Sequence, residues 1–212
     1  MTRILYLHGF ASGATSNKAA YFRDRFAERG VTIEILDLAG GDFDHLTITG
    51  QLGVIERAAH GEPVSLIGSS LGGYLAALYA SRHVEVERLV LMAPAFNMAA
   101  GWRARLGPEE MERWKQTGQM GVQHYGDGLV HQLHYAFIED ADRYEPYPSF
   151  HQPTVIFHGR HDDVVPVEQS VAFAQRHSNV ELHVVESGHE LTDVLDLMWE
   201  QVKTFMIWRS AP

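Results

Sequence analysis

The 212-residue chain contains no cysteine, and it has no long hydrophobic run. The first absence excludes disulfide bonds, a thiol nucleophile and thiolate metal ligands. No apolar stretch approaches the ~20 residues that cross a bilayer. The apolar run Ile4–Leu7 near the N-terminus is also too short for the core of a signal peptide. We therefore expect a cytoplasmic protein that is a monomer or a small homo-oligomer.

Basic residues are also scarce. The chain has 17 Lys and Arg against 27 Asp and Glu, which gives a formal net charge of −10. A negative chain is a poor ligand for nucleic acid or for an anionic membrane surface, so we expect neither partner. The 13 histidines are many for this length, and most of them are scattered in a way typical of surface positions.

The sequence has enough apolar residues for one substantial core. Hydrophobic residues make up 45% of the chain, and we expect a single domain over residues 1–212. Strand-type runs are predicted at 3–10, 31–36, 64–67, 86–92, 154–159 and 180–185. Helical spacing is predicted at 17–29, 46–59, 74–80, 108–116, 129–137, 167–177 and 191–208. This alternation predicts an α/β fold, with a mostly parallel sheet of about six strands and helices on both faces.

Residues 96–150 interrupt the alternation, and an insertion of this length between two strands is usually functional. We expect a small helical cap over the strand ends rather than a separate domain. The insertion is rich in aromatic residues, including Trp102 and Trp114. Together with Met92 and Met98, Trp102 is predicted to line an apolar substrate pocket. It is equally possible that the aromatic residues only hold the cap on the body.

The most informative stretch lies at residues 64–73. An apolar strand ends at Ile67, the next five residues read Gly-Ser-Ser-Leu-Gly, and a helical run follows. This order is typical of a nucleophile elbow, in which the middle serine of GxSxG sits on a sharp turn from strand to helix. Ser70 is the predicted nucleophile. Ser69 is the rival, but it is not centred between the two glycines.

A serine hydroxyl needs a base, and the base needs a carboxylate that fixes its tautomer. Asp162 follows the predicted strand 154–159, and His189 follows the predicted strand 180–185. Because the ends of parallel strands meet at one edge of a sheet, we expect Ser70, Asp162 and His189 to form a catalytic triad.

Other residues could compete for these roles. Asp163 is a second acid in the same loop, whereas His161 and His183 are alternative bases, and neither histidine follows a strand and a glycine. His131 and His134 stand three apart on a predicted helix, which could suggest a metal. A third ligand pattern is lacking nearby, so we predict no metal site.

An oxyanion hole requires two preset N–H donors. The amide of Leu71, directly after the predicted nucleophile, is one candidate. The amide of Phe10, in the loop after the first strand, is the other.

With these motifs assembled, the chain resembles the α/β-hydrolase superfamily. The resemblance is carried by residues 6–10, 68–73, 91–95 and 158–166 and by Gly188-His189, and the match Gly159-x-x-Asp162-x-x-Val165-Pro166 selects Asp162 over Asp163. It is similar in particular to small single-domain esterases and to the acyl-glucuronide esterase and palmitoyl-protein thioesterase of mitochondria. The resemblance implies a mixed, mostly parallel sheet, an acyl-enzyme mechanism and no cofactor. The family's first two strands have no counterpart, because the chain begins at the strand that carries His8-Gly9.

We therefore predict a serine carboxylesterase that acts on small-molecule esters of short to medium acyl chains. Hydrolysis of acyl thioesters, including deacylation of lipidated proteins, uses the same residues and is the alternative. A third possibility is a non-catalytic, ligand-binding member of the fold.

Overall fold

One six-stranded sheet forms the centre of the molecule. The computed structural model describes residues 3–13 and 15–207. The strand order is β2-β1-β3-β4-β7-β8, and all five pairings are parallel. The strands are β1 Arg3–Leu7, β2 Ile33–Ile35, β3 Val64–Ser69, β4 Val86–Met92, β7 Thr154–Gly159 and β8 Val180–Val185. All six predicted strands are confirmed, but the antiparallel strand implied by a mixed sheet is absent from this sheet of described residues.

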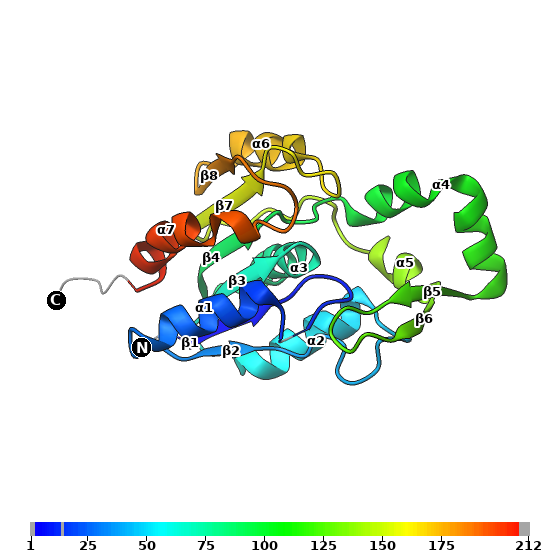
Figure 1. Cartoon of the computed structure of the whole chain (residues 1–212), viewed down its shortest axis with the longest axis horizontal. Helices are drawn as coiled ribbons and strands as arrows, with labels where there is room; N and C mark the ends of the chain where they lie inside the picture. Colours follow the sequence, from blue (N-terminus) through cyan, green and yellow to red (C-terminus); the bar gives the residue numbers. More distant parts are fainter. Residues whose placement is uncertain (1–2, 14, 208–212) are drawn as a thin grey trace.

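Helices cover both faces of the sheet, as predicted (Figure 1). The first face carries α2 Ile48–Ala59, α3 Leu71–Ala80 and α6 Val167–Arg176, and the opposite face carries α1 Asn17–Ala27 and α7 Leu195–Ile207. Side chains of a strand alternate between faces, so Leu5 and Leu7 enter the first core whereas Ile4 and Tyr6 enter the second.

The C-terminal helix begins later than its sequence pattern predicts. Leu191 adopts a left-handed conformation with φ of 56°, and a 3-10 turn, η1 Thr192–Val194, precedes α7. The predicted end of the helix at Trp208 lies outside the described residues. Among the helices that are described, none combines the length and the apolarity needed to cross a membrane.

The insertion between β4 and β7 forms the cap. It consists of α4 Met98–Thr117, the antiparallel hairpin of β5 Gln119–Gln123 and β6 Val130–His134, and the short helix α5 Ala136–Ala141. Gly107 breaks α4 with φ of 76°, and Pro108 begins the second half, where the sequence predicts a helix. Figure 1 shows these elements gathered at one end of the molecule.

The predicted helix over residues 129–137 is wrong. Residues 130–134 instead form β6, and helical structure begins only at Ala136. The missed signal is Asp127-Gly128, a turn sequence that favours a hairpin. Because the side chains of a strand alternate, His131 and His134 lie on opposite faces and do not form a pair.

The cap is attached to the body by buried aromatic side chains and by backbone hydrogen bonds. Phe137 of α5 is fully buried and packs against Phe10 of the body, with ring centroids 5.6 Å apart. Within the cap, Trp114 is only 1% exposed, and its Nε1 donates to the Leu133 carbonyl at 2.9 Å. At the tip of the hairpin, the Tyr125 N–H donates to the Ala11 carbonyl at 2.8 Å. The cap therefore reaches the loop after β1, next to the predicted oxyanion residue Phe10.

Candidate active site

Ser70 occupies a strained turn between β3 and α3. Its φ and ψ are 53° and −117°, a combination that non-glycine residues rarely adopt. The N–H of Ser70 donates to the Met92 carbonyl at 2.8 Å, and the Ser70 carbonyl accepts from Ala95 at 3.0 Å. These bonds to the end of β4 hold the turn in place.

Close backbone approach explains the glycines of the elbow. A Cβ on Gly68 would meet the Gly72 carbonyl oxygen at 2.4 Å, and a Cβ on Gly72 would meet the Leu7 oxygen at 2.1 Å. A Cβ on Gly9 would lie 3.4 Å from the Cβ of Ser70. The loop after β1 therefore packs directly against the elbow.

The structure brings Ser70, His189 and Asp162 together. His189 Nε2 lies 3.0 Å from Ser70 Oγ, and His189 Nδ1 lies 2.7 Å from Asp162 Oδ2. A Cβ on Gly159 would lie 2.4 Å from the carbonyl oxygens of Ser187 and Gly188, so the loops that carry the acid and the histidine are in contact. Ser70, His189 and Asp162 thus form one hydrogen-bonded chain across 119 positions of sequence.

Asp162 is held as an anion. Burial raises the pKa of its carboxyl group, but hydrogen bonds from His158, His189 and the Val165 amide outweigh burial and lower that pKa well below the usual range. An ionised Asp162 accepts a hydrogen bond from the Nδ1–H of His189, which leaves the lone pair of Nε2 for the serine hydroxyl.

His158 also contacts Asp162, a role that the sequence patterns did not predict. Its side chain is fully buried, Nε2 donates to the Val165 carbonyl at 2.9 Å, and Nε2 also lies 3.2 Å from Asp162 Oδ2. Nδ1 accepts from the Ser170 hydroxyl at 2.7 Å. A histidine directly before Gly159 at the end of a buried strand was the available signal.

The rival bases lie elsewhere. His161 is exposed and contacts Glu186 at 3.1 Å, whereas His183 stacks on Phe157 within the sheet. Asp163 is exposed, and Ser69 is buried within β3.

Both predicted oxyanion donors line the same cavity as Ser70. Leu71 is the first residue of α3, and an N–H at that position has no acceptor within its own helix. Phe10 precedes Ala11, whose φ of 51° turns the chain sharply. The Phe10 ring packs edge-on against the Trp102 ring, with ring centroids 4.9 Å apart.

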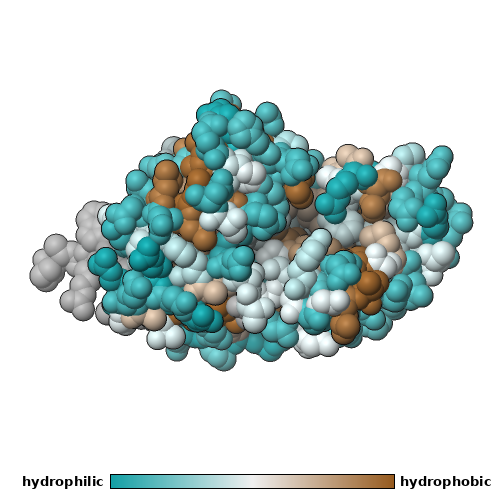
Figure 2. Space-filling model, viewed as in Figure 1, coloured by the Kyte–Doolittle hydropathy of each residue, from teal (hydrophilic) through white to brown (hydrophobic). Residues whose placement is uncertain are grey.

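A cavity of about 770 Å³ opens above Ser70 and His189. The cap supplies Met98, Trp102, Val122 and Tyr125 to its wall, among others. Figure 2 shows hydrophobic side chains in the depression between the body and the cap. Both interpretations of the aromatic residues therefore hold, for different residues: Trp102 faces the cavity, whereas Phe137 packs against Phe10 and holds the cap on the body.

Met92 does not line this cavity, contrary to the sequence prediction. It is fully buried in the core beneath α1 and α7, because its position in β4 directs the side chain to that face of the sheet. Its backbone carbonyl nevertheless accepts the hydrogen bond from the Ser70 N–H that stabilises the elbow.

The family described as an uncharacterised protein family (UPF0227) matches residues 3–206. The chain belongs to this family. Among curated proteins, this UPF0227 chain is 24% identical over 214 residues to the palmitoyl-protein thioesterase ABHD10, mitochondrial, of Bos taurus. The match covers 92% of this chain and 69% of that protein.

Solved structures show the same fold. Mouse alpha/beta hydrolase domain-containing protein 10 superposes with a TM-score of 0.80 at 20% identity, over 96% of this chain and 89% of that chain. Est1E from Butyrivibrio proteoclasticus superposes with a TM-score of 0.77 at 23% identity, over 97% of this chain and 87% of that chain. The chain therefore has the α/β-hydrolase fold.

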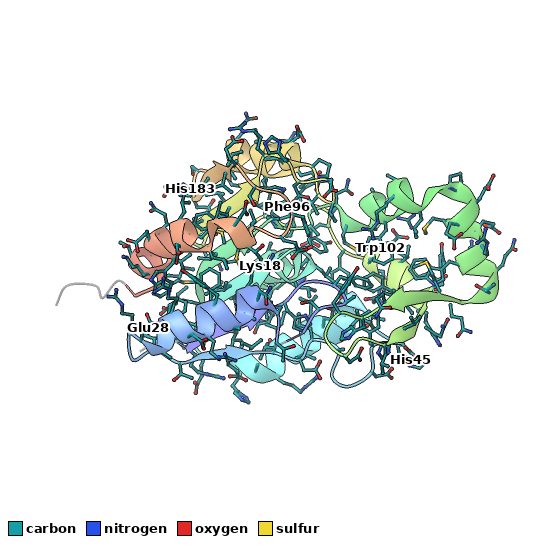
Figure 3. The ribbon with its side chains drawn as sticks, viewed as in Figure 1. Lys18, Glu28, His45, Phe96, Trp102 and His183 are labelled. Carbon is teal, nitrogen blue, oxygen red and sulfur yellow. The ribbon has the colours of Figure 1, made fainter. Side chains whose placement is uncertain are left out.

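One buried cation lies on the body side of the cavity in this UPF0227 chain. Lys18 is 8% exposed, lines the cavity from α1, and donates to the Glu190 carbonyl at 2.7 Å. Burial lowers the pKa of its ammonium group. Figure 3 labels Lys18 on the body and Trp102 on the cap. Lys18 thereby anchors the residue next to His189.

Proposed function

We propose that this protein is a serine carboxylesterase with Ser70, His189 and Asp162 as its catalytic triad. The observation that carries the proposal is the hydrogen-bonded chain from Ser70 Oγ through His189 to Asp162, with links of 3.0 and 2.7 Å, at the floor of an accessible cavity.

In the proposed reaction, His189 Nε2 takes the proton of the Ser70 hydroxyl while Oγ attacks the acyl carbonyl carbon. The amides of Phe10 and Leu71 stabilise the negative charge that develops on the carbonyl oxygen. The tetrahedral intermediate collapses, and His189 returns the proton to the leaving alcohol. Water then attacks the acyl-enzyme with His189 as base, which releases the acid and restores Ser70. These steps use only water and groups of this chain, so we propose no cofactor.

The cavity walls support apolar acyl groups. Phe10, Phe96, Met98 and Trp102 present hydrocarbon and ring surface to the space above Ser70. We therefore propose short- to medium-chain acyl esters as substrates, with a small-molecule alcohol as leaving group. A cytoplasmic location and a monomeric or small homo-oligomeric state remain part of this proposal.

Acyl-thioester hydrolysis is the second candidate. It is favoured by the curated relatives, which are named palmitoyl-protein thioesterases and are 24–26% identical to this chain. The same triad serves both reactions, since only the leaving group differs.

The first experiment is the Ser70→Ala variant. We expect ester turnover to fall by ~10⁴–10⁶, because the nucleophile is removed. The matched control is Ser69→Ala, which removes the neighbouring hydroxyl and should keep turnover within about tenfold of the wild type. Circular dichroism checks that both variants fold. A Ser70→Ala enzyme that keeps most of its rate would refute the proposal.

A matched panel of oxygen and sulfur esters, with acyl chains of graded length, separates the two candidate substrates.

The third possibility, a non-catalytic binding protein, is tested by labelling with a fluorophosphonate. We expect covalent labelling of Ser70 that is lost in Ser70→Ala, whereas an unlabelled wild type would favour the binding protein.

A further inference from the structure

The turn of the β5–β6 hairpin carries a second cluster of reactive side chains. His124, Asp127 and His131 come from the two ends of this turn and from its middle. The donor atoms of the three side chains all lie within 4.8 Å of one another. None of the three belongs to the proposed triad.

The carboxylate of Asp127 lies between the two imidazoles. Its Oδ1 is 3.1 Å from His124 Nδ1, and its Oδ2 is 2.9 Å from His131 Nε2. The other ring nitrogen of His131, Nδ1, lies 3.1 Å from Asp44 Oδ1 on the body. Both rings also pack edge-on against the Phe43 ring. The centroid distances are 4.9 Å for His124 and 5.3 Å for His131. The packing and the Asp44 contact fix the orientation of the two imidazoles.

We propose that His124 Nδ1, His131 Nε2 and the Asp127 carboxylate bind a divalent transition-metal ion, with zinc as the best match. Ligand atoms about 2.0–2.1 Å from a tetrahedral zinc ion lie about 3.3 Å apart. The two nitrogen-to-oxygen distances, 3.1 and 2.9 Å, are close to that value but run to different oxygens of Asp127, so the carboxylate would bind the ion through both oxygens or turn to offer one. Water would complete the coordination.

The contact between Asp44 and His131 supports a metal. A histidine that ligates a metal usually donates its other ring N–H to a carboxylate, which orients the ring. Two imidazoles with one carboxylate suit zinc, copper or nickel, whereas calcium and magnesium prefer sites made entirely of oxygen.

The simpler interpretation is an ion pair, with a protonated His131 between Asp127 and Asp44. It accounts for His131 but not for His124. Nδ1 of His124 is buried and makes no aligned hydrogen bond among the described residues, although Asp127 is close. An unsatisfied buried nitrogen is costly, and a metal ion would satisfy it.

A bound metal would fasten the cap at the active-site cavity. Tyr125, next to His124, lines the cavity and bonds through its N–H to Ala11. A metal ion would hold this turn closed and, through the contact between His131 and Asp44, would tie it to the body. The metal site itself is proposed independently of the esterase activity.

The test is titration of the chelator-treated 212-residue protein with zinc chloride. Calorimetry measures binding, and the melting temperature measures the effect of zinc on stability. We expect one zinc ion per chain and a rise in Tm of at least about 5 °C at saturating zinc. His124→Asn and Asp127→Asn should each abolish the rise. Asp44→Asn should weaken zinc binding by about 10–100-fold, as expected for a carboxylate that only orients a ligand.

Two further variants control for other histidines. His60→Asn changes an exposed residue in a left-handed conformation that Asn tolerates, and it should bind zinc like the wild type. His45 lies against His134 with ring centroids 4.2 Å apart, near the hairpin (Figure 3), so His45→Asn tests that pair.

The absence of stoichiometric zinc binding overturns the proposal, as does binding that survives in His124→Asn or is lost in His45→Asn. If a zinc-site variant fails to fold, the tetrahedral absorption of cobalt(II) added to the wild type decides the question; its absence counts against the site.

Discussion

At the scale of single residues, Asp162 has more hydrogen-bond partners than orientation of one histidine requires. Its Oδ1 accepts from the amides of Val164 and Val165 at 2.9 and 2.8 Å, and its Oδ2 faces both His189 and His158. These donors stabilise the carboxylate rather than the neutral acid. The folded state therefore prefers an ionised Asp162 more strongly than the unfolded chain does.

The stability of the protein should depend on this charge in acid. An aspartate in an unfolded chain has a pKa of about 3.9, and the folded-state pKa of Asp162 is lower. Its contribution to the free energy of unfolding is fully present above the unfolded pKa and is lost as the pH falls toward the folded pKa. Urea denaturation of Asp162→Asn should show a loss of roughly 1–3 kcal/mol at pH 6, and the difference from the wild type should shrink below pH 4.

The matched control is Asp163→Asn, which changes the exposed neighbour. It should stay within about 0.5 kcal/mol of the wild type. A difference for Asp162→Asn that remains constant down to pH 3 would contradict the pKa argument.

At the scale of elements, the site depends on how closely α3 packs against β1 and β3. The glycines of the elbow allow contacts between backbones, and those contacts set the position of Ser70 relative to the loop after β1. Gly72 is the tightest case, because an added Cβ would lie 2.1 Å from the Leu7 oxygen and 2.6 Å from the His8 oxygen. Both obstacles are backbone atoms of a central strand and its loop, which cannot rotate away.

Gly72→Ala should therefore destabilise the protein by at least ~3 kcal/mol, measured by urea denaturation. The matched control is Gly101→Ala in α4, where an added Cβ meets nothing within 4 Å. That control should be neutral or stabilising by up to ~1 kcal/mol, because alanine favours a helix more than glycine does. A Gly72→Ala protein as stable as the wild type would show that α3 can move away from β1.

At the scale of the whole molecule, the cap and the body together enclose the reaction site. The residues of the proposed triad and of the proposed oxyanion hole belong to the body, whereas Met98, Trp102 and Tyr125 enter the cavity from the cap. The cap is therefore expected to select the acyl group without taking part in bond breaking.

Trp102→Ala should weaken binding of longer acyl chains selectively. Loss of the indole removes apolar contact surface from the cavity, so KM for a medium-chain ester should rise by about tenfold, with a smaller change for an acetate ester. Trp114→Phe is the control, because Trp114 is buried but does not line the cavity. It should lower Tm and leave the ratio of the two KM values unchanged. Equal changes of both KM values in Trp102→Ala would count against a role in acyl selection.

The sequence alone determined the strand–helix alternation and the order of nucleophile, acid and histidine. Both are encoded locally: apolar runs define the strands, and Gly68 and Gly72 mark the elbow. Because parallel strands all end at one edge of the sheet, the proximity of Ser70, Asp162 and His189 could also be predicted.

Only the tertiary structure decided which face each side chain meets and how the insertion folds. Met92 carries an apolar side chain suited to either location, and its direction follows from the strand alternation once β4 is placed between β3 and β7. Residues 130–134 form a strand because β5 pairs with them, a non-local contact that local spacing does not report. The contacts of His131 with Asp127 and Asp44 depend on the same pairing, and the contact with Asp44 joins residues 87 positions apart.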